Sequence, residues 1–222
     1  MPHPNLCRAV WLGDMDYLEA RDLQLSLVEK VHSGQEPNTM LMLEHSHVYT
    51  KGRLSKESDV LLPEEELAAK GINMYETDRG GQVTYHGPGQ LVVYPIVNLR
   101  GWGGPVKYVR ALEQVVIATL AEMGITANCE SGSTGVWTDQ GKIAAIGVKI
   151  SRGIAFHGLA LNVNTDLAYY QNIIPCGIAD RPVTCMAAIL GQPVDMKLVR
   201  YGLVYQFGRE FGWRMEDGVL AR

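Results

Sequence analysis

Apolar residues recur at helical spacing in three long stretches, and each stretch is bounded by residues that favour helix ends. In the first, Asp14 can cap a helix that closes near Gly34, with an apolar stripe of Ala20, Leu23, Leu27 and Val31. In the second, Pro105 begins and Gly124 ends a helix, with a stripe of Val109, Leu112, Val116 and Leu120. In the third, Asp195 is the expected cap, with a stripe of Val199, Leu203, Phe207 and Phe211. Pro63, followed by three glutamates and stopped by Gly71, predicts a further short helix.

Runs rich in strand-forming residues lie between these helices. They predict strands at 6–12, 39–44, 72–76, 91–94, 135–138, 141–150 and 154–163. Groups of strands separated by single helices favour a mixed β-sheet with helices packed on it. With no internal repeat or linker, residues 1–222 are expected to form one α/β (α+β) domain.

Composition narrows the classes of function. A net charge of −4 argues against a nucleic-acid-binding protein. The chain opens without a secretory signal and contains no apolar run near the ~18 residues that span a bilayer, so we expect no membrane association. Four cysteines, none in a CxxC pair, are expected to be free thiols in a reducing cytoplasm.

The stretch 78–98, DRGGQVTYHGPGQLVVYPIVN, joins a glycine-rich loop to an apolar strand. Glycine lacks a Cβ, so its backbone can approach a ligand closely. Arg79, Gln82, Tyr85 and His86 supply more hydrogen-bonding chemistry than a simple chain reversal needs. We therefore predict a binding loop, with a plain turn as the alternative.

Lys142 begins the strand 141–150, GKIAAIGVKI. Strand alternation places it on the face of Ala144, Ile146, Val148 and Ile150, and places Lys149 on the other face. Desolvation on an apolar face disfavours an ammonium group, so such a lysine can act as a general base. A lysine at the first position of a strand can also extend to water, and position alone leaves both interpretations open.

The stretch 157–164, HGLALNVN, alternates in the same way. His157 is expected on the face of Leu159, Leu161 and Val163. Gly158 and Ala160, on the opposite face, leave a strip of small residues against which a ligand could lie. Taken alone, His157 is expected to be a hydrogen-bonded core histidine rather than a catalyst.

Cys176 is the cysteine best placed for chemistry, because Pro175 and Gly177 hold it on an irregular loop. A cysteine on such a loop can be a nucleophile if a nearby base generates the thiolate. Cys185 lies in an apolar helical run and is expected to pack, whereas Cys7 and Cys129 indicate nothing beyond burial.

Other motifs are weak. His45 and His47, with His86 and His157, lack the spacings of zinc sites, so we predict no metal. Residues 135–142 resemble a phosphate-binding loop, but the glycine gap is one residue too long and Ile143 replaces the required Ser or Thr. Neither G-x-G-x-x-G after a strand nor G-x-S-x-G occurs.

Together, these motifs resemble those of the lipoyl(octanoyl) transferases, which move an octanoyl group from acyl carrier protein onto a protein lysine. The resemblance covers most of the chain, through RGGQVTYHGPGQ at 79–90, GKIA at 141–144 with Gly147-Val148, HGLALNV at 157–163 and PCGI at 175–178. It implies a biotin/lipoate-ligase-like fold. It also implies a catalytic dyad of Cys176 and Lys142.

The same resemblance implies a set of substrate-binding residues that line an acyl pocket. They are Arg79, Gly80, Gly81, Gln82, Val83, Thr84, Tyr85, His86, Ala145, Ile146, Gly147, His157, Gly158, Leu159 and Ala160. No cofactor is expected, because a carrier thioester is already activated and acyl transfer from it needs no nucleotide.

The implied partners are an acyl carrier protein as octanoyl donor, and the lipoyl domains of 2-oxoacid dehydrogenases and the glycine cleavage H protein as acceptors. Because such a carrier is acidic, a local basic patch is expected, with Lys107, Lys149 and Arg152 as candidates. Two alternatives stay open. One is an ATP-dependent lipoate or biotin ligase of the same fold, and the other is a non-catalytic module that binds lipoyl domains.

Overall fold

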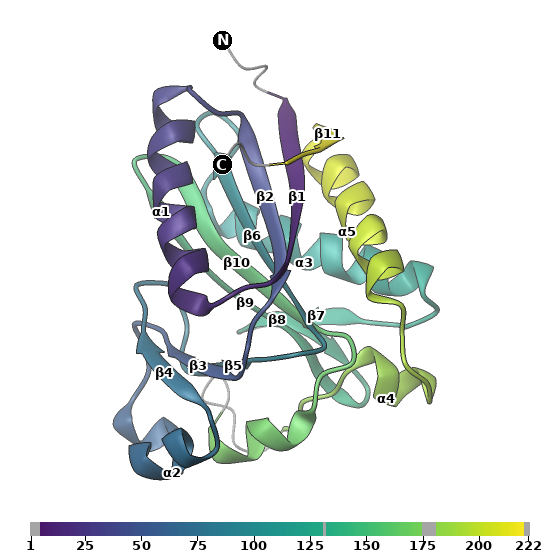
Figure 1. The fold of residues 1–222 in the computed structure, drawn as a ribbon. Coiled ribbons are helices and arrows are strands. Elements are labelled where there is room, and N and C mark those ends of the chain that lie inside the picture. Colours follow the sequence, from purple (N-terminus) through teal and green to yellow (C-terminus); the bar gives the residue numbers. More distant parts are fainter. Residues whose placement is uncertain (1–4, 131, 175–180, 220–222) are drawn as a thin grey trace.

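An eight-stranded mixed sheet forms the centre of the molecule in the computed structural model, which describes residues 5–130, 132–174 and 181–219 (Figure 1). β1 is parallel to both of its neighbours, and the other adjacent strands are antiparallel. In order across the sheet, the strands are β11 (Arg214–Asp217), β1 (Leu6–Asp14), β2 (Asn38–Glu44), β6 (Gln90–Asn98), β10 (Ile154–Asn162), β9 (Gly141–Ser151), β8 (Ser133–Thr138) and β7 (Asn128–Glu130).

Helices cover both faces of this sheet (Figure 1). Helix α1 (Tyr17–Ser33) packs on β2, β6 and β10 and closes one apolar core. Helices α3 (Pro105–Glu122) and α5 (Met196–Phe211) contact each other and close a larger core on the opposite face. The predicted mixed α/β fold is therefore confirmed.

A smaller sheet lies at one end of the large one and has its own apolar core, which includes Tyr49, Val83 and Tyr85. Its strands, in order, are β4 (Asn73–Glu76), β3 (Val48–Lys51) and β5 (Thr84–His86). Around it lie α2 (Glu64–Ala69) and the 3₁₀ turns η1 (Glu57–Asp59) and η2 (Leu167–Asn172). α4 (Met186–Leu190) precedes α5.

Helix boundaries agree with the sequence at most positions. Gly34 ends α1 in the left-handed conformation, and the Asp195 carboxylate accepts the N–H of Lys197 at the start of α5. The expected cap at Asp14 is wrong, because β1 continues through Asp14. Asp16 caps α1 instead, and its carboxylate accepts the N–H of Leu18 at 2.7 Å.

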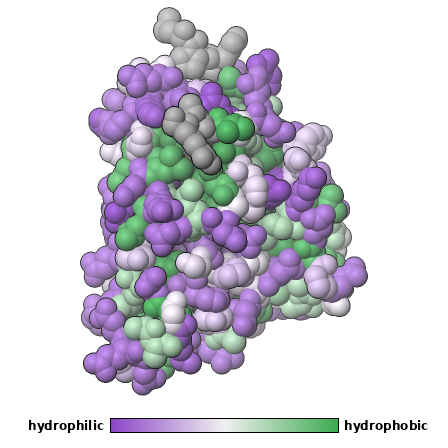
Figure 2. All heavy atoms as spheres, in the orientation of Figure 1, coloured by the Kyte–Doolittle hydropathy of each residue, from purple (hydrophilic) through white to green (hydrophobic). Residues whose placement is uncertain are grey.

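Among the described residues, no helix is both long and apolar enough to cross a membrane. On the side shown in Figure 2, hydrophilic residues cover most of the surface, and hydrophobic ones gather in the upper half between α1 and α5. Cys7 and Cys185 are buried, as expected, and burial raises the pKa of the Cys7 thiol. Cys129 is only partly buried, with its sulfur 3.4 Å from a carboxylate oxygen of Glu113.

Candidate functional site

A cavity of about 300 Å³ lies between the paired strands β9 and β10 and the loop that runs from β4 to β5. The exposed Leu54 and the start of β8 also contribute to its lining. Its lining residues are Tyr17, Thr50, Leu54, Arg79, Gly81, Gln82, Thr84, His86, Tyr94, Gly132, Ser133, Thr134, Lys142, Ala145, Ile146, Gly147, His157, Gly158, Leu159 and Ala160.

Small residues form the floor of this cavity. Ala145 of β9 pairs with Ala160 of β10, and Gly147 pairs with Gly158 two residues further along. A Cβ on Gly147 would lie 2.9 Å from the carbonyl oxygen of Gly80, and the N–H of Gly80 donates to Val148 O at 3.0 Å. Glycine is needed there because the 79–81 loop lies directly on the strand.

Lys142 lies at one end of this floor, and its side chain is buried. The prediction that it shares a face with Ala144 and Ile146 is wrong. The pairing of β8 with β9 shifts register between Val136–Ala144 and Trp137–Lys142, so β9 contains one extra residue, Ile143. This β-bulge reverses the alternation: Ile143 and Ala144 both enter the large core, and Lys142 lines the cavity.

One contact and one glycine accommodate the Lys142 side chain. Its Nζ lies 5.2 Å from the centroid of the Trp137 ring, within cation–π range. Gly135 has a φ of 123°, and a Cβ there would lie 2.7 Å from Lys142 Cε and 2.6 Å from Ala144 O. A larger residue at Gly135 would therefore collide with the lysine.

The main chain of Lys142 is also paired. Its N–H donates to Pro182 O at 3.0 Å, and its carbonyl accepts the N–H of Thr184 at 2.9 Å. Pro182 follows Cys176 by six residues in the sequence. Cys176 itself lies outside the described residues.

Arg79 uses its guanidinium to hold loops together. The side chain is buried, and one terminal nitrogen donates to both the carbonyl (2.6 Å) and the hydroxyl (2.9 Å) oxygen of Thr50. The other terminal nitrogen donates to Gly80 O at 3.0 Å. Gly52 permits this approach, since a Cβ there would lie 2.8 Å from the guanidinium.

A buried hydrogen-bond network continues from Thr50 through the cavity wall. His86 Nδ1 donates to the side-chain oxygen of Gln90 at 2.8 Å, and the Gln90 amide donates to Asn162 at 2.9 Å and to the Tyr170 hydroxyl at 3.1 Å. Asn162 in turn donates to Thr184 O. Burial lowers the pKa of His86 to about 3, so the imidazole is neutral at pH 7.

His157 occupies the end of the cavity opposite Lys142, with a left-handed φ of 55°. The register of β10 with β6 places it opposite Pro95, and the His157 N–H donates outside the sheet, to the Gln24 side chain of α1 at 2.9 Å. Its ring stacks on that of Phe156, with centroids 5.0 Å apart. The expectation that His157 shares a face with Leu159 is therefore wrong.

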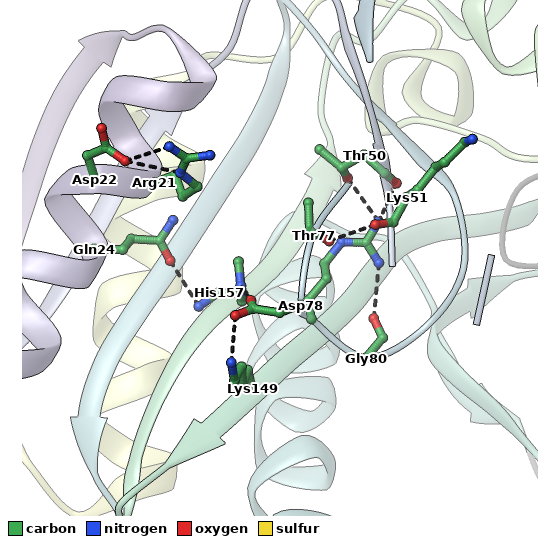
Figure 3. Close-up of polar contacts among 11 residues, drawn as sticks. Arg21, Asp22, Gln24, Thr50, Lys51, Thr77, Asp78, Gly80, Lys149 and His157 are labelled. Carbon is green, nitrogen blue, oxygen red and sulfur yellow. Dashed lines mark hydrogen bonds and ion pairs between the residues drawn. The ribbon is translucent and has the colours of Figure 1, made fainter. Parts of the chain in front are cut away.

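An acidic residue that sequence reasoning missed holds His157. Asp78 accepts from His157 Nε2 at 2.8 Å and from Lys149 Nζ at 2.5 Å, as Figure 3 shows. Burial lowers the pKa of His157, although Asp78 opposes this shift. Partial burial raises the pKa of Asp78, but the hydrogen bonds from Lys149 and His157 outweigh it and the net pKa is lowered.

The structure brings most of the predicted site residues to one cavity. Gly80, Val83 and Tyr85 are not among its lining residues. Val83 and Tyr85 pack in the small core instead, and Gly80 touches β9 through its backbone. Tyr17, Thr50, Leu54, Tyr94 and residues 132–134 line the cavity but were not predicted, because nothing in their local sequence marks them.

The histidines that could have suggested zinc are engaged elsewhere. His45 Nδ1 donates to Met15 O at 2.8 Å, and its Nε2 lies 2.9 Å from the Tyr94 hydroxyl. Burial lowers the pKa of His45 to about 4. His47 stacks on Tyr169. Within the described ranges, no three metal-binding side chains gather at a point.

Each of the three residues expected in the basic patch has a polar partner. Lys149 pairs with Asp78, Arg152 pairs with Glu29, and Lys107 donates to the carbonyl oxygen of Trp102. Two of these three cations thus form ion pairs with carboxylates.

Comparison with known proteins identifies the family. The model of the lipoyl protein ligase A/B catalytic domain matches residues 16–208. A protein of Acidobacterium capsulatum named octanoyltransferase is 47% identical, with 94% of this chain and 93% of the relative covered. A Koribacter versatilis octanoyltransferase is also 47% identical, with 94% and 84% covered.

Solved structures agree on the fold. A lipoate-protein ligase A bound with ATP superposes with a TM-score of 0.77 at 15% identity, covering 96% of this chain and 89% of the other. The biotin protein ligase of Aquifex aeolicus with biotin and ATP gives 0.58 at 17% identity, with 92% and 70% covered. The expected biotin/lipoate-ligase-like fold is confirmed, and the chain belongs to the lipoyl protein ligase A/B catalytic domain family.

Proposed function

We propose that this protein is an acyltransferase that moves an octanoyl group from octanoyl-acyl carrier protein to a lysine of a lipoyl domain, through a thioester on Cys176. The observation that carries the proposal is a buried lysine at one end of a cavity floored by alanine and glycine. The relatives named octanoyltransferase, 47% identical over almost the whole chain, support the same activity.

The proposed dyad joins Lys142 to Cys176. Lys142 is anchored through its backbone to residues 182 and 184, and Cys176 lies six residues before Pro182 in the sequence. A thiol with an ordinary pKa of about 8.5 is mostly protonated at pH 7, so it needs a partner base to attack efficiently.

Acylation of the enzyme begins when Lys142 Nζ takes the proton from Cys176 Sγ. The thiolate attacks the carbonyl carbon of the octanoyl thioester, and a bond from sulfur to carbon forms. The bond between that carbon and the carrier sulfur then breaks, and Lys142 returns the proton to the departing carrier thiol. Backbone N–H groups near the glycines stabilise the tetrahedral oxyanion.

The second half of the reaction uses the same two groups. The ε-amine of the acceptor lysine attacks the thioester carbon, and Lys142 takes the proton that the nitrogen loses. The carbon–sulfur bond to Cys176 breaks, and the proton returns to the Cys176 sulfur. An amide is formed and the free dyad is regenerated.

The proposed acceptors are the lipoyl domains of 2-oxoacid dehydrogenases and the glycine cleavage H protein. A reactive thiol that must stay reduced fits a cytoplasmic location. Transfer from a thioester needs no cofactor, because the acyl group arrives activated. The floor supplies an apolar surface, and each buried methylene contributes about 0.8 kcal/mol to binding.

The deciding experiment is the intact mass of the protein after incubation with octanoyl-acyl carrier protein. We expect one added octanoyl group in the wild type, no adduct in Cys176→Ser, and a normal adduct in Cys129→Ser, the matched change at a partly exposed thiol. An unmodified wild type would overturn the proposal, as would an adduct of undiminished amount in Cys176→Ser.

The same samples separate the alternatives. Release of pyrophosphate from ATP with free octanoate would identify a ligase, which the likeness to the ATP-bound ligase A fold makes worth measuring. Tight binding of a lipoyl domain with no turnover under either condition would identify a non-catalytic binding module.

A further inference from the structure

A second cavity of about 300 Å³ adjoins the first cavity at its His157 end, away from Lys142. Two residues, Tyr17 and His157, line both cavities. Because each of these side chains borders both spaces, the two together form the partition between them. The other residues lining the second cavity are Arg21, Gln24, Leu25, Glu76, Thr77, Asp78 and Phe156.

The length of the floor can be compared with an octanoyl chain. Lys142 and Gly147 are five residues apart on β9, and the bulge at Ile143 shortens that path to about four strand rises, or roughly 13 Å. With carbon–carbon bonds of about 1.5 Å, a zigzag chain advances roughly 1.3 Å per bond, so octanoyl spans about 9 Å. An octanoyl carbonyl beside Lys142 therefore puts the methyl end about 4 Å short of the Gly147–Gly158 pair, which leaves room for roughly three more methylenes. A longer chain would next meet the partition.

The two halves of the partition are held differently. His157 is fixed by the backbone bond to Gln24 and the side-chain bond to Asp78, both drawn in Figure 3. Tyr17 is held by ring contacts, because its ring stacks on Tyr75 at 5.2 Å and meets His45 edge-on at 5.5 Å.

Tyr17 can be truncated without removing the helix cap. It is the first residue of α1, but the capping bonds run from Asp16 to the N–H groups of Leu18 and Glu19. The ring is 4% exposed, so it fills space rather than covering the outer surface. Loss of the ring would leave a gap between the two cavities.

We propose that the ring of Tyr17 is the end wall that sets the upper limit on acyl chain length, and that its removal joins the two cavities into one longer slot. This inference rests on the proposed octanoyl transfer and adds the residue that selects for chain length. With the wall removed, methylenes beyond about the eleventh carbon can enter the second cavity, and each methylene that becomes buried there is worth up to about a fourfold gain in affinity.

The test uses acyl carrier protein loaded with chains of 6 to 16 carbons, and measures the rate of acyl-enzyme formation by intact mass. In Tyr17→Ala we expect the ratio of the 14-carbon rate to the 8-carbon rate to rise at least tenfold over the wild type. Tyr17→Leu, which keeps an apolar side chain, serves the same purpose if Tyr17→Ala does not fold. An unchanged ratio in a folded variant of either kind would overturn the inference.

Two controls isolate the wall. Tyr17→Phe keeps the ring and should leave the chain-length ratio within twofold. Leu25→Ala enlarges the second cavity without touching the partition, and it should also leave the ratio unchanged. A rise of tenfold in either control would show that something other than the Tyr17 ring sets the length.

Failure of the role given to Tyr17 can be distinguished from failure of the proposed octanoyl transfer. A wild type that forms no octanoyl adduct overturns the transfer reaction. Calorimetric binding of free octanoate and tetradecanoate to the same proteins then measures the wall without any transfer step. A wild type that is acylated normally, beside a Tyr17→Ala protein with the wild-type chain-length profile, overturns only the role of Tyr17.

Discussion

The two ends of the cavity are built by different means. At one end the main chain does the positioning: a bulge at Ile143 turns Lys142 into the cavity, Gly135 makes room for it, and backbone bonds to Pro182 and Thr184 hold the strand. At the other end side chains do it, through the contacts of His157 with Asp78 and of Tyr17 with Tyr75. Side-chain contacts can change without rebuilding the sheet, so the far end is the part of the site where specificity can vary.

The largest expected effect on the reaction rate is at the end of the cavity that contains Lys142. Lys142→Ala should slow acylation of the enzyme by roughly 10²–10⁴, the usual contribution of a positioned general base. Single-turnover kinetics with octanoyl-carrier measure it. Lys149→Ala, on the same strand but half-exposed, should stay within threefold of the wild type. A normal single-turnover rate for Lys142→Ala would remove this lysine from the mechanism.

The far end should respond most strongly to acid. His45 packs edge-on against Tyr17, and His86 packs against His45. Their folded-state pKa values are about 4 and about 3, against an ordinary 6.5. Below pH 6.5 the unfolded chain binds protons that the folded protein does not. The free energy of unfolding therefore decreases as the pH is lowered, by up to about 1.4 kcal/mol per pH unit for each histidine.

Urea unfolding at pH 7, 6 and 5 measures this loss. His86→Gln, which removes one of the buried histidines, should make the dependence on pH less steep. A free energy of unfolding that stays constant between pH 6.5 and 5 would mean that these histidines are not held neutral by burial.

An intermediate effect is expected at Gly135. Gly135→Ala places a Cβ within 2.7 Å of both Ala144 O and Lys142 Cε, and should lower the free energy of unfolding by about 1–3 kcal/mol. Because the clash displaces the lysine, acylation should slow as well. Gly124→Ala is the matched control, since Gly124 also has a positive φ but has no atom within 4 Å of the added Cβ. It should lose stability and keep its acylation rate, and equal loss of rate in both variants would contradict the role given to Gly135.

The smallest effect is expected at Asp78. Its side chain is half-exposed, so the ion pair with Lys149 should contribute about 0–1 kcal/mol. Asp78→Asn retains an oxygen for His157, and kcat/KM for octanoyl-carrier should fall less than threefold. A loss of tenfold or more would show that charge holds the far end, and the contrast between the two ends would need revision.

Local signals in the sequence predicted most of the fold. Helix stops such as Gly34 and caps such as Asp195 act within a few residues, so spacing and residue type are sufficient to find them. The Asp14 cap failed by two residues because pairing with β2 extends β1. The helix and strand propensities of single residues do not include such tertiary pairing.

The site was predictable only in part, for the same reason. Motifs located the loop around Arg79 and the floor at Gly147 and Gly158. Simple alternation failed at Lys142, where β9 has a bulge, and at His157, where the backbone is left-handed and its N–H bonds to Gln24 of α1. Both features depend on neighbouring elements rather than on local sequence. Tyr17 reaches the cavity only through the docking of α1, which no local pattern encodes.

Because β11 is the edge strand beside β1 and comes late in the chain, it affects how the sheet forms during synthesis. β1 can pair with β2 soon after it leaves the ribosome, but its outer edge stays open until Arg214–Asp217 arrive. During that interval a nascent chain presents an unpaired strand that could join another polypeptide. Deletion of 214–217 should therefore reduce the yield of soluble chain in a cell far more than so small a sheet contact would suggest, and chaperones that shield nascent strands should offset part of the loss.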